Sequence, residues 1–223
     1  MLKTDQSPET ILLEAGAWRR VLKWEGEPVL TISLRWPRLP EDLPGPRRVS
    51  RYYRQVADCW RTRWETELLR RAREAAAAAR EESRPFSPWS AVLDFTPTLR
   101  EGGLLSLYQD AVECTGDTRP VTLRRSDTWE LPSGTLRSLA SFLRPPHRRR
   151  RVLAEVAAQI ERRIASGESL FFEDWRRRLP AAFDPDRFYL TGEGAVLYFP
   201  LCTVAPYAEG IPVFPIQIPP PAP

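Results

Sequence analysis

The chain has 223 residues, which is enough for one large domain or two small domains with a sizeable core. Its composition, 42% hydrophobic and 28% charged, is typical of a soluble globular protein. No run of about 18 apolar residues occurs, so no transmembrane helix is predicted. The single histidine excludes metal sites that need two or three histidines.

Arginine dominates the positive charge. The formal net charge is +4, and Lys3 and Lys23 are the only lysines among 33 basic residues. Arginine holds carboxylates and stacks on aromatic rings better than lysine does. A genome with GC-rich codons explains the same preference without any ligand. Both explanations stay open, and a pI near 9.2 permits an acidic partner without requiring one.

The first residues, Met1–Gln6, lack the basic and apolar regions of a signal peptide. We therefore expect the chain as written to be cytoplasmic, and extracytoplasmic if the native gene is longer.

The cysteines Cys59, Cys114 and Cys202 are odd in number and form no C-x-x-C motif. Their spacing indicates neither a zinc ribbon nor a disulfide framework. We expect buried free thiols. A Cys114–Cys202 disulfide is the alternative, because both residues fall in predicted strands.

The first part of the chain predicts strands and one long helix. Residues 28–39 have the alternating, β-branched pattern of a strand, and an earlier strand or short helix is expected at 10–24. In residues 47–83 apolar side chains recur at three- and four-residue steps, which predicts a long amphipathic helix. Arg51 and Arg54 fall largely on its other faces.

The remaining elements are shorter. Strands are expected at 89–96, 104–113 and 121–131, a short helix at 136–143, helices at 147–166 and 170–179, an apolar hairpin at 188–199, and a frayed Pro-rich tail at 215–223.

Together these elements predict an α+β fold. An antiparallel sheet packs against one long helix and two or three shorter helices, without a β-α-β alternation. Segments 188–199 and 204–216 should pair in one antiparallel sheet against the long helix. The side chains expected to be largely buried are Trp60, Trp64, Leu68, Tyr189, Leu197 and Phe199.

Several blocks of the sequence resemble one known family. They are Arg51–Tyr53, Leu105–Tyr108, Thr115–Gly116, Asp127–Leu131 with Gly134, Phe188–Thr191 and Ala205–Pro212. Together they resemble the RsiV-like C-terminal sensor domain of anti-sigma factors, which is also found beside PdaC-type peptidoglycan deacetylases.

The resemblance implies two regions and a binding role. Residues 10–85 resemble the N-terminal deacetylase-associated region, and residues 86–219 resemble the RsiV-like C-terminal domain. In anchored relatives the domain senses a ligand, which for RsiV is lysozyme. Deacetylase activity in some relatives lies in a separate catalytic domain. In the family a Gly-Ala-His-Gly-like loop commonly follows Thr-Gly. In this chain the bulkier segment Asp117–Pro120 stands in its place. We therefore assign to this segment no role that the loop has in relatives.

The candidate site residues are few. Tyr207 and Glu209 lie in a bent segment with two prolines and one glycine, and Arg148, Arg149, Arg150 and Arg151 form the one basic run. Folding roles and a solvated helix face are the simpler explanations. We predict no catalytic residue, because His147 stands at an expected helix start beside this run. We also predict no cofactor and no metal ligand.

We interpret the chain as a non-enzymatic binding or sensing module of the RsiV-like family, with an unknown ligand. An envelope-facing accessory domain that binds cell-wall polymer or lysozyme is one alternative, and an enzyme of unknown type is another. A basic partner would be repelled by a +4 chain, so we expect an anionic or neutral partner. No nucleic-acid-binding module is evident, which argues against nucleic acid.

Overall fold

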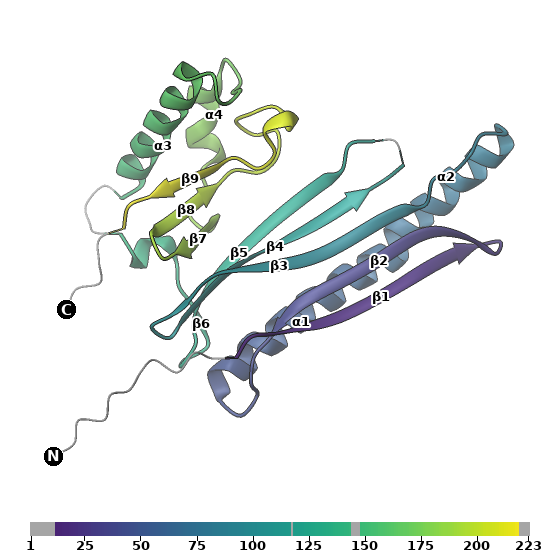
Figure 1. Cartoon of the computed structure of the whole chain (residues 1–223), viewed down its shortest axis with the longest axis horizontal. Helices are drawn as coiled ribbons and strands as arrows, with labels where there is room; N and C mark the ends of the chain where they lie inside the picture. Colours follow the sequence, from purple (N-terminus) through teal and green to yellow (C-terminus); the bar gives the residue numbers. More distant parts are fainter. Residues whose placement is uncertain (1–11, 117, 144–147, 219–223) are drawn as a thin grey trace. The chain divides into compact units, whose positions relative to one another are not determined.

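The structure, a computed structural model, describes residues 12–116, 118–143 and 148–218 (Figure 1). The chain divides into two compact units. The first unit is the chain up to Thr96 with Gln109–Arg124 and Leu131–Gly134, and the second unit is the remainder. The long strands β3 (Trp89–Glu101), β4 (Leu104–Cys114) and β5 (Val121–Glu130) contribute residues to both units.

Nine strands form two sheets in the described part of the chain. The larger sheet has the order β1-β2-β3-β4-β5-β6, and the smaller has the order β7-β8-β9. β1 (Glu14–Trp24) and β2 (Glu27–Arg38) form an antiparallel hairpin, in which Glu25 and Gly26 have φ angles of 48° and 87°. Positive φ at both central residues suits the twist of a two-residue hairpin turn. β1 is thus a strand, and not the short helix that was the alternative.

β2 and β3 pair in parallel, from Leu30 opposite Trp89 to Leu34 opposite Leu93. The expectation of a purely antiparallel sheet without a β-α-β unit is therefore wrong at this pair. The helix between these strands is the crossover that parallel pairing requires, because it returns the chain to the starting edge of the sheet.

The long helix is continuous from Pro44 to Glu81. It consists of α1 (Pro44–Arg63), a π-helical turn η1 (Trp64–Leu68) and α2 (Leu69–Glu81). Figure 1 shows it running along β1 and β2. Its predicted apolar face is confirmed, since Trp64 and Leu68 are buried against β2 and β3, although Trp60 is only half-buried.

The second unit combines the smaller sheet with helices. Its strands are antiparallel, as predicted for the terminal segments. Its elements are β6 (Thr135–Leu136), the 3-10 turn η2 (Leu139–Ser141), α3 (Arg148–Ala165), α4 (Trp175–Ala182), β7 (Phe188–Thr191), β8 (Gly194–Tyr198), the 3-10 turn η3 (Tyr207–Glu209) and β9 (Val213–Ile216).

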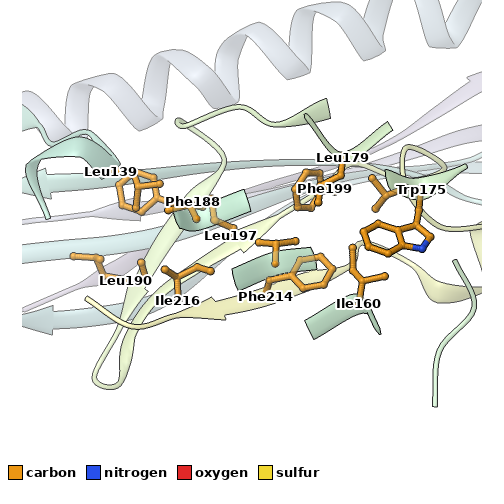
Figure 2. Close-up of a cluster of buried hydrophobic side chains, with 14 residues drawn as sticks. Leu139, Ile160, Trp175, Leu179, Phe188, Leu190, Leu197, Phe199, Phe214 and Ile216 are labelled. Carbon is orange, nitrogen blue, oxygen red and sulfur yellow. The ribbon is translucent and has the colours of Figure 1, made fainter. Parts of the chain in front are cut away.

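The core of the second unit joins the smaller sheet to α3 and α4. Val156 and Ile160 of α3 and Trp175 of α4 share one buried cluster with Leu197 and Phe214. Figure 2 shows this cluster. The predicted burial of Leu197 is confirmed, and so is that of Tyr189 and Phe199. The expected packing of this sheet against the long helix is wrong, because the helices that share its core are α3 and α4.

Two local predictions also need correction. Residues 170–174 are not helical, because the N–H of Leu170 donates to Glu209 and the N–H of Phe172 donates to the carbonyl of Val204. Pro215 and Ile216 belong to β9 and not to a frayed tail. Residues 219–223 of that tail lie outside the described residues.

The cysteines are free, as expected, but Cys59 and Cys202 are exposed instead of buried, and Cys114 is half-buried. Cys202 lies in a turn with a φ of 58° and not in a strand. The alternative Cys114–Cys202 disulfide is therefore absent.

Candidate functional site

The segment with Tyr207 and Glu209 connects two loops of the second unit. Tyr207–Glu209 form η3, and Glu209 accepts a hydrogen bond from the N–H of Leu170 at 2.7 Å through Oε1. Glu209 thereby holds the chain that leads to α4, and Tyr207 is half-buried. These contacts favour a folding role for Glu209. Ligand binding by either residue stays a prediction.

The basic run Arg148–Arg151 forms the first turn of α3. Arg149 donates to the carbonyl of Pro180 at 2.8 Å and lies 5.7 Å from the ring centre of Phe183. Arg150 and Arg151 are exposed, and neither has an ion-pair partner in the part of the chain that the structure describes. The side chain of Arg148 lies outside that part.

Most other arginines near α3 have partners. Arg176 pairs with Glu161 at 3.0 Å, and Arg177 and Arg178 both bind Asp174, at 2.7 and 2.5 Å. The hydrogen bond from Arg178, followed by that from Arg177, lowers the pKa of the Asp174 carboxyl. Asp174 is therefore an ion-pair anchor before α4. These ion pairs account for Asp174 more simply than a metal site or a glycosidase carboxylate pair does.

Polar side chains of α3 bind the backbone of β9 along its free edge. Glu155 accepts from the N–H of Gln217 at 3.2 Å, Gln159 donates to the carbonyl of Pro215 at 2.7 Å, and Arg163 donates to the carbonyl of Val213 at 2.8 Å. The four-residue steps on the helix match two-residue steps along the strand. These side chains satisfy backbone groups that an edge strand would otherwise leave open for pairing.

Two of the sequence blocks that carry the family resemblance, Leu105–Tyr108 and Asp127–Leu131, contribute buried hydroxyl groups to the second unit. The N–H of Leu190 donates to Ser106 Oγ at 2.8 Å, and Ser106 Oγ lies 2.8 Å from Thr128 Oγ1. This chain of hydrogen bonds connects β7 with β4 and β5. Ser126 continues the contact, 3.2 Å from the hydroxyl of Tyr198. Each group is buried and satisfied, so the cluster stabilises the fold and is not an open site.

A second group of arginines lies on α1, in the first unit. Arg47, Arg48, Arg51 and Arg54 are exposed, and none has an ion pair among the described residues. The sequence pattern places Arg51 and Arg54 on a polar helix face. Their spacing indicates that face, but only the tertiary structure shows that no acidic side chain of the described residues pairs with them.

The π-helical turn holds a buried tryptophan. The indole N–H of Trp64 donates to Glu113 Oε1 of β4 at 2.7 Å, and Arg63 lies 3.6 Å from the same oxygen. Trp64 is fully buried. The π-helical turn thus places the indole N–H of Trp64 next to the Glu113 carboxylate of β4.

Two of the sequence predictions fall on residues whose placement is not described. His147 lies outside the described residues, and so does Asp117 of the altered loop. Within the described ranges, no three His, Cys, Asp or Glu side chains come together as a metal site would require. None of the helices described is both long and apolar enough to cross a membrane.

Part of the chain is similar in sequence to a family without an assigned activity. The profile of the family described as "Protein of unknown function (DUF3298)" matches residues 141–218. The match covers α3, α4 and the smaller sheet. No curated protein matches the sequence significantly.

Two solved structures share the fold. A DUF3298 family protein from Pseudomonas aeruginosa PAO1 aligns with a TM-score of 0.61 and 16% identity, over 94% of this chain and 95% of that chain. A member of the same family from Bacteroides fragilis NCTC 9343 aligns with a TM-score of 0.67 and 15% identity, over 93% and 90%. Residues 141–218 are thus similar in sequence to this family, and nearly the whole chain has the fold of two proteins described as its members.

Proposed function

We propose that the chain is a non-enzymatic binding module of the RsiV-like type, with an anionic or neutral ligand. The division into a deacetylase-associated region at 10–85 and an RsiV-like region at 86–219 is part of this proposal. The observation that supports it is the pair Arg150 and Arg151, which is exposed and unpaired among the described residues, within the segment matched by the family profile.

The position of this pair has a cost in helix stability. Positive charge in the first turn of a helix opposes the helix dipole by about 0.3–1 kcal/mol per charge at low salt. Arg149, in the same turn, offsets its own cost by donating a hydrogen bond to the carbonyl of Pro180. Arg150 and Arg151 make no such contact in the described chain, so a ligand with carboxylate or phosphate groups would supply the missing interaction.

The test compares two double variants on heparin–agarose, which presents a dense anionic surface. Arg150→Gln with Arg151→Gln removes the proposed contacts. Arg100→Gln with Arg162→Gln removes the same charge from exposed, unpaired positions of the same unit. We expect the first variant to elute at clearly lower salt than the second, because the binding is localised and salt-screened.

Equal elution of the two variants would show that only net charge matters, and would contradict the proposal. Tight, salt-insensitive binding of the wild-type chain to lysozyme would also contradict it, because lysozyme of the animal type is a basic protein.

A further inference from the structure

We propose that the first turns of α1 form a docking surface for a short acidic segment of a partner protein. The surface consists of Arg47, Arg48, Arg51 and Arg54, which we call the α1 arginine stripe. It belongs to the first unit and is independent of the arginines of α3. The proposal therefore goes beyond the function proposed above.

Helix geometry places the stripe on one outward face. Arg47, Arg51 and Arg54 follow one another at four- and three-residue steps, so their side chains share a face, with Arg48 beside them. Val49 and Tyr53 are buried on the opposite side of the helix. The burial of this opposite side holds the helix in place and leaves the four guanidinium groups in solvent.

The stripe lacks the counter-charges that the later arginines of α1, Arg61 and Arg63, have. Further along the same face, Arg61 pairs with Asp58 at 3.1 Å, and Glu65 pairs with Arg20 at 3.0 Å. The first turn of α1 contains no acidic residue and no side-chain cap. Four like charges close together on a helix repel one another, and Arg47, in the first turn, also opposes the helix dipole. The sequence thus maintains a locally unfavourable charge group that an anionic partner would stabilise.

The neighbours of the stripe favour a peptide over a nucleic acid. The stripe extends over seven residue steps, or about 10 Å of helix, and Asp58 then reverses the sign of the charge. A phosphate backbone continuing along this face would meet Asp58 and Glu65. Single-stranded nucleic acids also need exposed aromatic rings for stacking, and on α1 Tyr53 is buried and Tyr52 half-buried.

A lipid surface fits less well for a similar reason. Among the described residues of α1 and the loop before it, Leu43 is the one large apolar residue that is exposed. Glu41 and Asp42, both exposed, precede it. These carboxylates would be repelled by an anionic headgroup layer. A narrow acidic segment can contact the arginines and avoid Glu41, Asp42 and Asp58.

The spacing of carboxylates in an extended peptide matches the stripe. Alternate residues of an extended chain point to the same side about 6–7 Å apart, and side chains three or four positions apart on a helix lie about 5–6 Å apart at Cβ. Two or three acidic residues at alternate positions can therefore each meet one guanidinium. Arginine offers each carboxylate two parallel hydrogen bonds.

The test uses the full chain and a fluorescein-labelled peptide of four Glu-Gly repeats, with a Gln-Gly peptide of equal length as the control ligand. The stripe variant is Arg47→Gln, Arg48→Gln, Arg51→Gln and Arg54→Gln. The charge-matched control variant is Arg19→Gln, Arg73→Gln, Arg100→Gln and Arg162→Gln, whose arginines are exposed and unpaired among the described residues. Circular dichroism verifies that both variants are folded.

We expect fluorescence anisotropy at low salt to show binding of the Glu-Gly peptide but not of the Gln-Gly peptide. The stripe variant should bind at least about 10-fold more weakly than wild type, and the control variant within about 3-fold. Physiological salt should weaken wild-type binding. The Arg150→Gln, Arg151→Gln variant should lose less affinity for the peptide than the stripe variant does, which separates this proposal from the proposed function.

Three results would overturn the proposal. The stripe and control variants could lose affinity equally, the wild-type chain could fail to bind the Glu-Gly peptide, or a labelled oligonucleotide or anionic vesicles could bind the stripe more tightly than the peptide does.

Discussion

At the scale of single residues, Trp64 connects the long helix to the larger sheet. Its ring is fully buried between the helix and the sheet, and its indole N–H donates a hydrogen bond to Glu113. A buried donor without an acceptor costs about 1–3 kcal/mol, which is more than a satisfied hydrogen bond contributes. The pair therefore constrains both the π-helical turn and the face of β4.

Replacing Glu113 tests this contact. We expect Glu113→Ala to lower the free energy of unfolding by about 1–3 kcal/mol, since it leaves the indole N–H of Trp64 unpaired. Glu113→Gln keeps an acceptor oxygen and should cost less. Urea denaturation followed by tryptophan fluorescence measures both, and equal costs would show that the acceptor is unimportant.

The Asp174 carboxyl provides a pH-dependent contact. Hydrogen bonds from Arg178 and Arg177 lower its pKa in the folded state. Its stabilising effect is therefore fully present above the unfolded pKa, about 3.9, and is lost as the pH falls through the lower folded pKa. We expect the stability difference between wild type and Asp174→Asn to be constant near neutral pH and to shrink below about pH 4. A difference that grows on acidification would contradict this.

At the scale of elements, the backbone at the start of the long helix lies close to the turn after β5. A Cβ atom added at Gly45 would lie 1.9 Å from the carbonyl oxygen of Leu131. Only glycine permits this approach between the first turn of α1 and the turn after β5.

We expect Gly45→Ala to lower the melting temperature strongly, by about 8 °C or more, because either the helix or the turn must shift. Gly192→Ala is the control, since a Cβ there meets nothing within 4 Å and its φ is not positive. That substitution should change stability by no more than about 0.5 kcal/mol. Similar small effects for both variants would show that the two segments separate easily.

The contacts between α3 and β9 give a second prediction at this scale. Arg163 donates to the Val213 carbonyl and lies 4.7 Å from the ring centre of Phe214. We expect Arg163→Ala to destabilise the chain by about 1–3 kcal/mol, through the lost charge-assisted hydrogen bond and ring contact. The exposed neighbour Arg162 makes no such contact, and Arg162→Ala should stay within about 0.5 kcal/mol. Thermal unfolding measures the stability of both variants, and equal losses would contradict this prediction.

At the scale of the whole molecule, the two units have separate apolar cores. One core joins the long helix to β2 and β3, and the other joins α3 and α4 to the smaller sheet. Both cores are built from aliphatic and aromatic side chains. The buried hydroxyl of Ser106 on β4 forms a hydrogen bond with that of Thr128 on β5 and accepts another from the N–H of Leu190 on β7.

The proposed function predicts that the purified chain lacks hydrolase activity on peptidoglycan or acetylated sugars. The reason is the single histidine, His147, beside a basic run in a sequence with no catalytic motif. Release of acetate or reducing ends that is abolished by His147→Ala would contradict this prediction.

The sequence by itself determined most of the elements and their buried faces. The long helix, the hairpin of β7 and β8, and the burial of Trp64 and Phe199 follow from apolar periodicity, which is a local property of the chain. The candidate run at Arg150 and Arg151 was equally visible, because consecutive charges need no partner information.

Only the tertiary structure decided the pairing. The parallel contact of β2 with β3, the packing of the smaller sheet on α3, and the unpaired state of the α1 arginine stripe all depend on residues far apart in the sequence. Apolar periodicity indicates which face of a helix or strand is buried, but it does not indicate which other helix or strand packs against that face. The free charges of Arg47, Arg51 and Arg54 became apparent only when the positions of the acidic side chains were known.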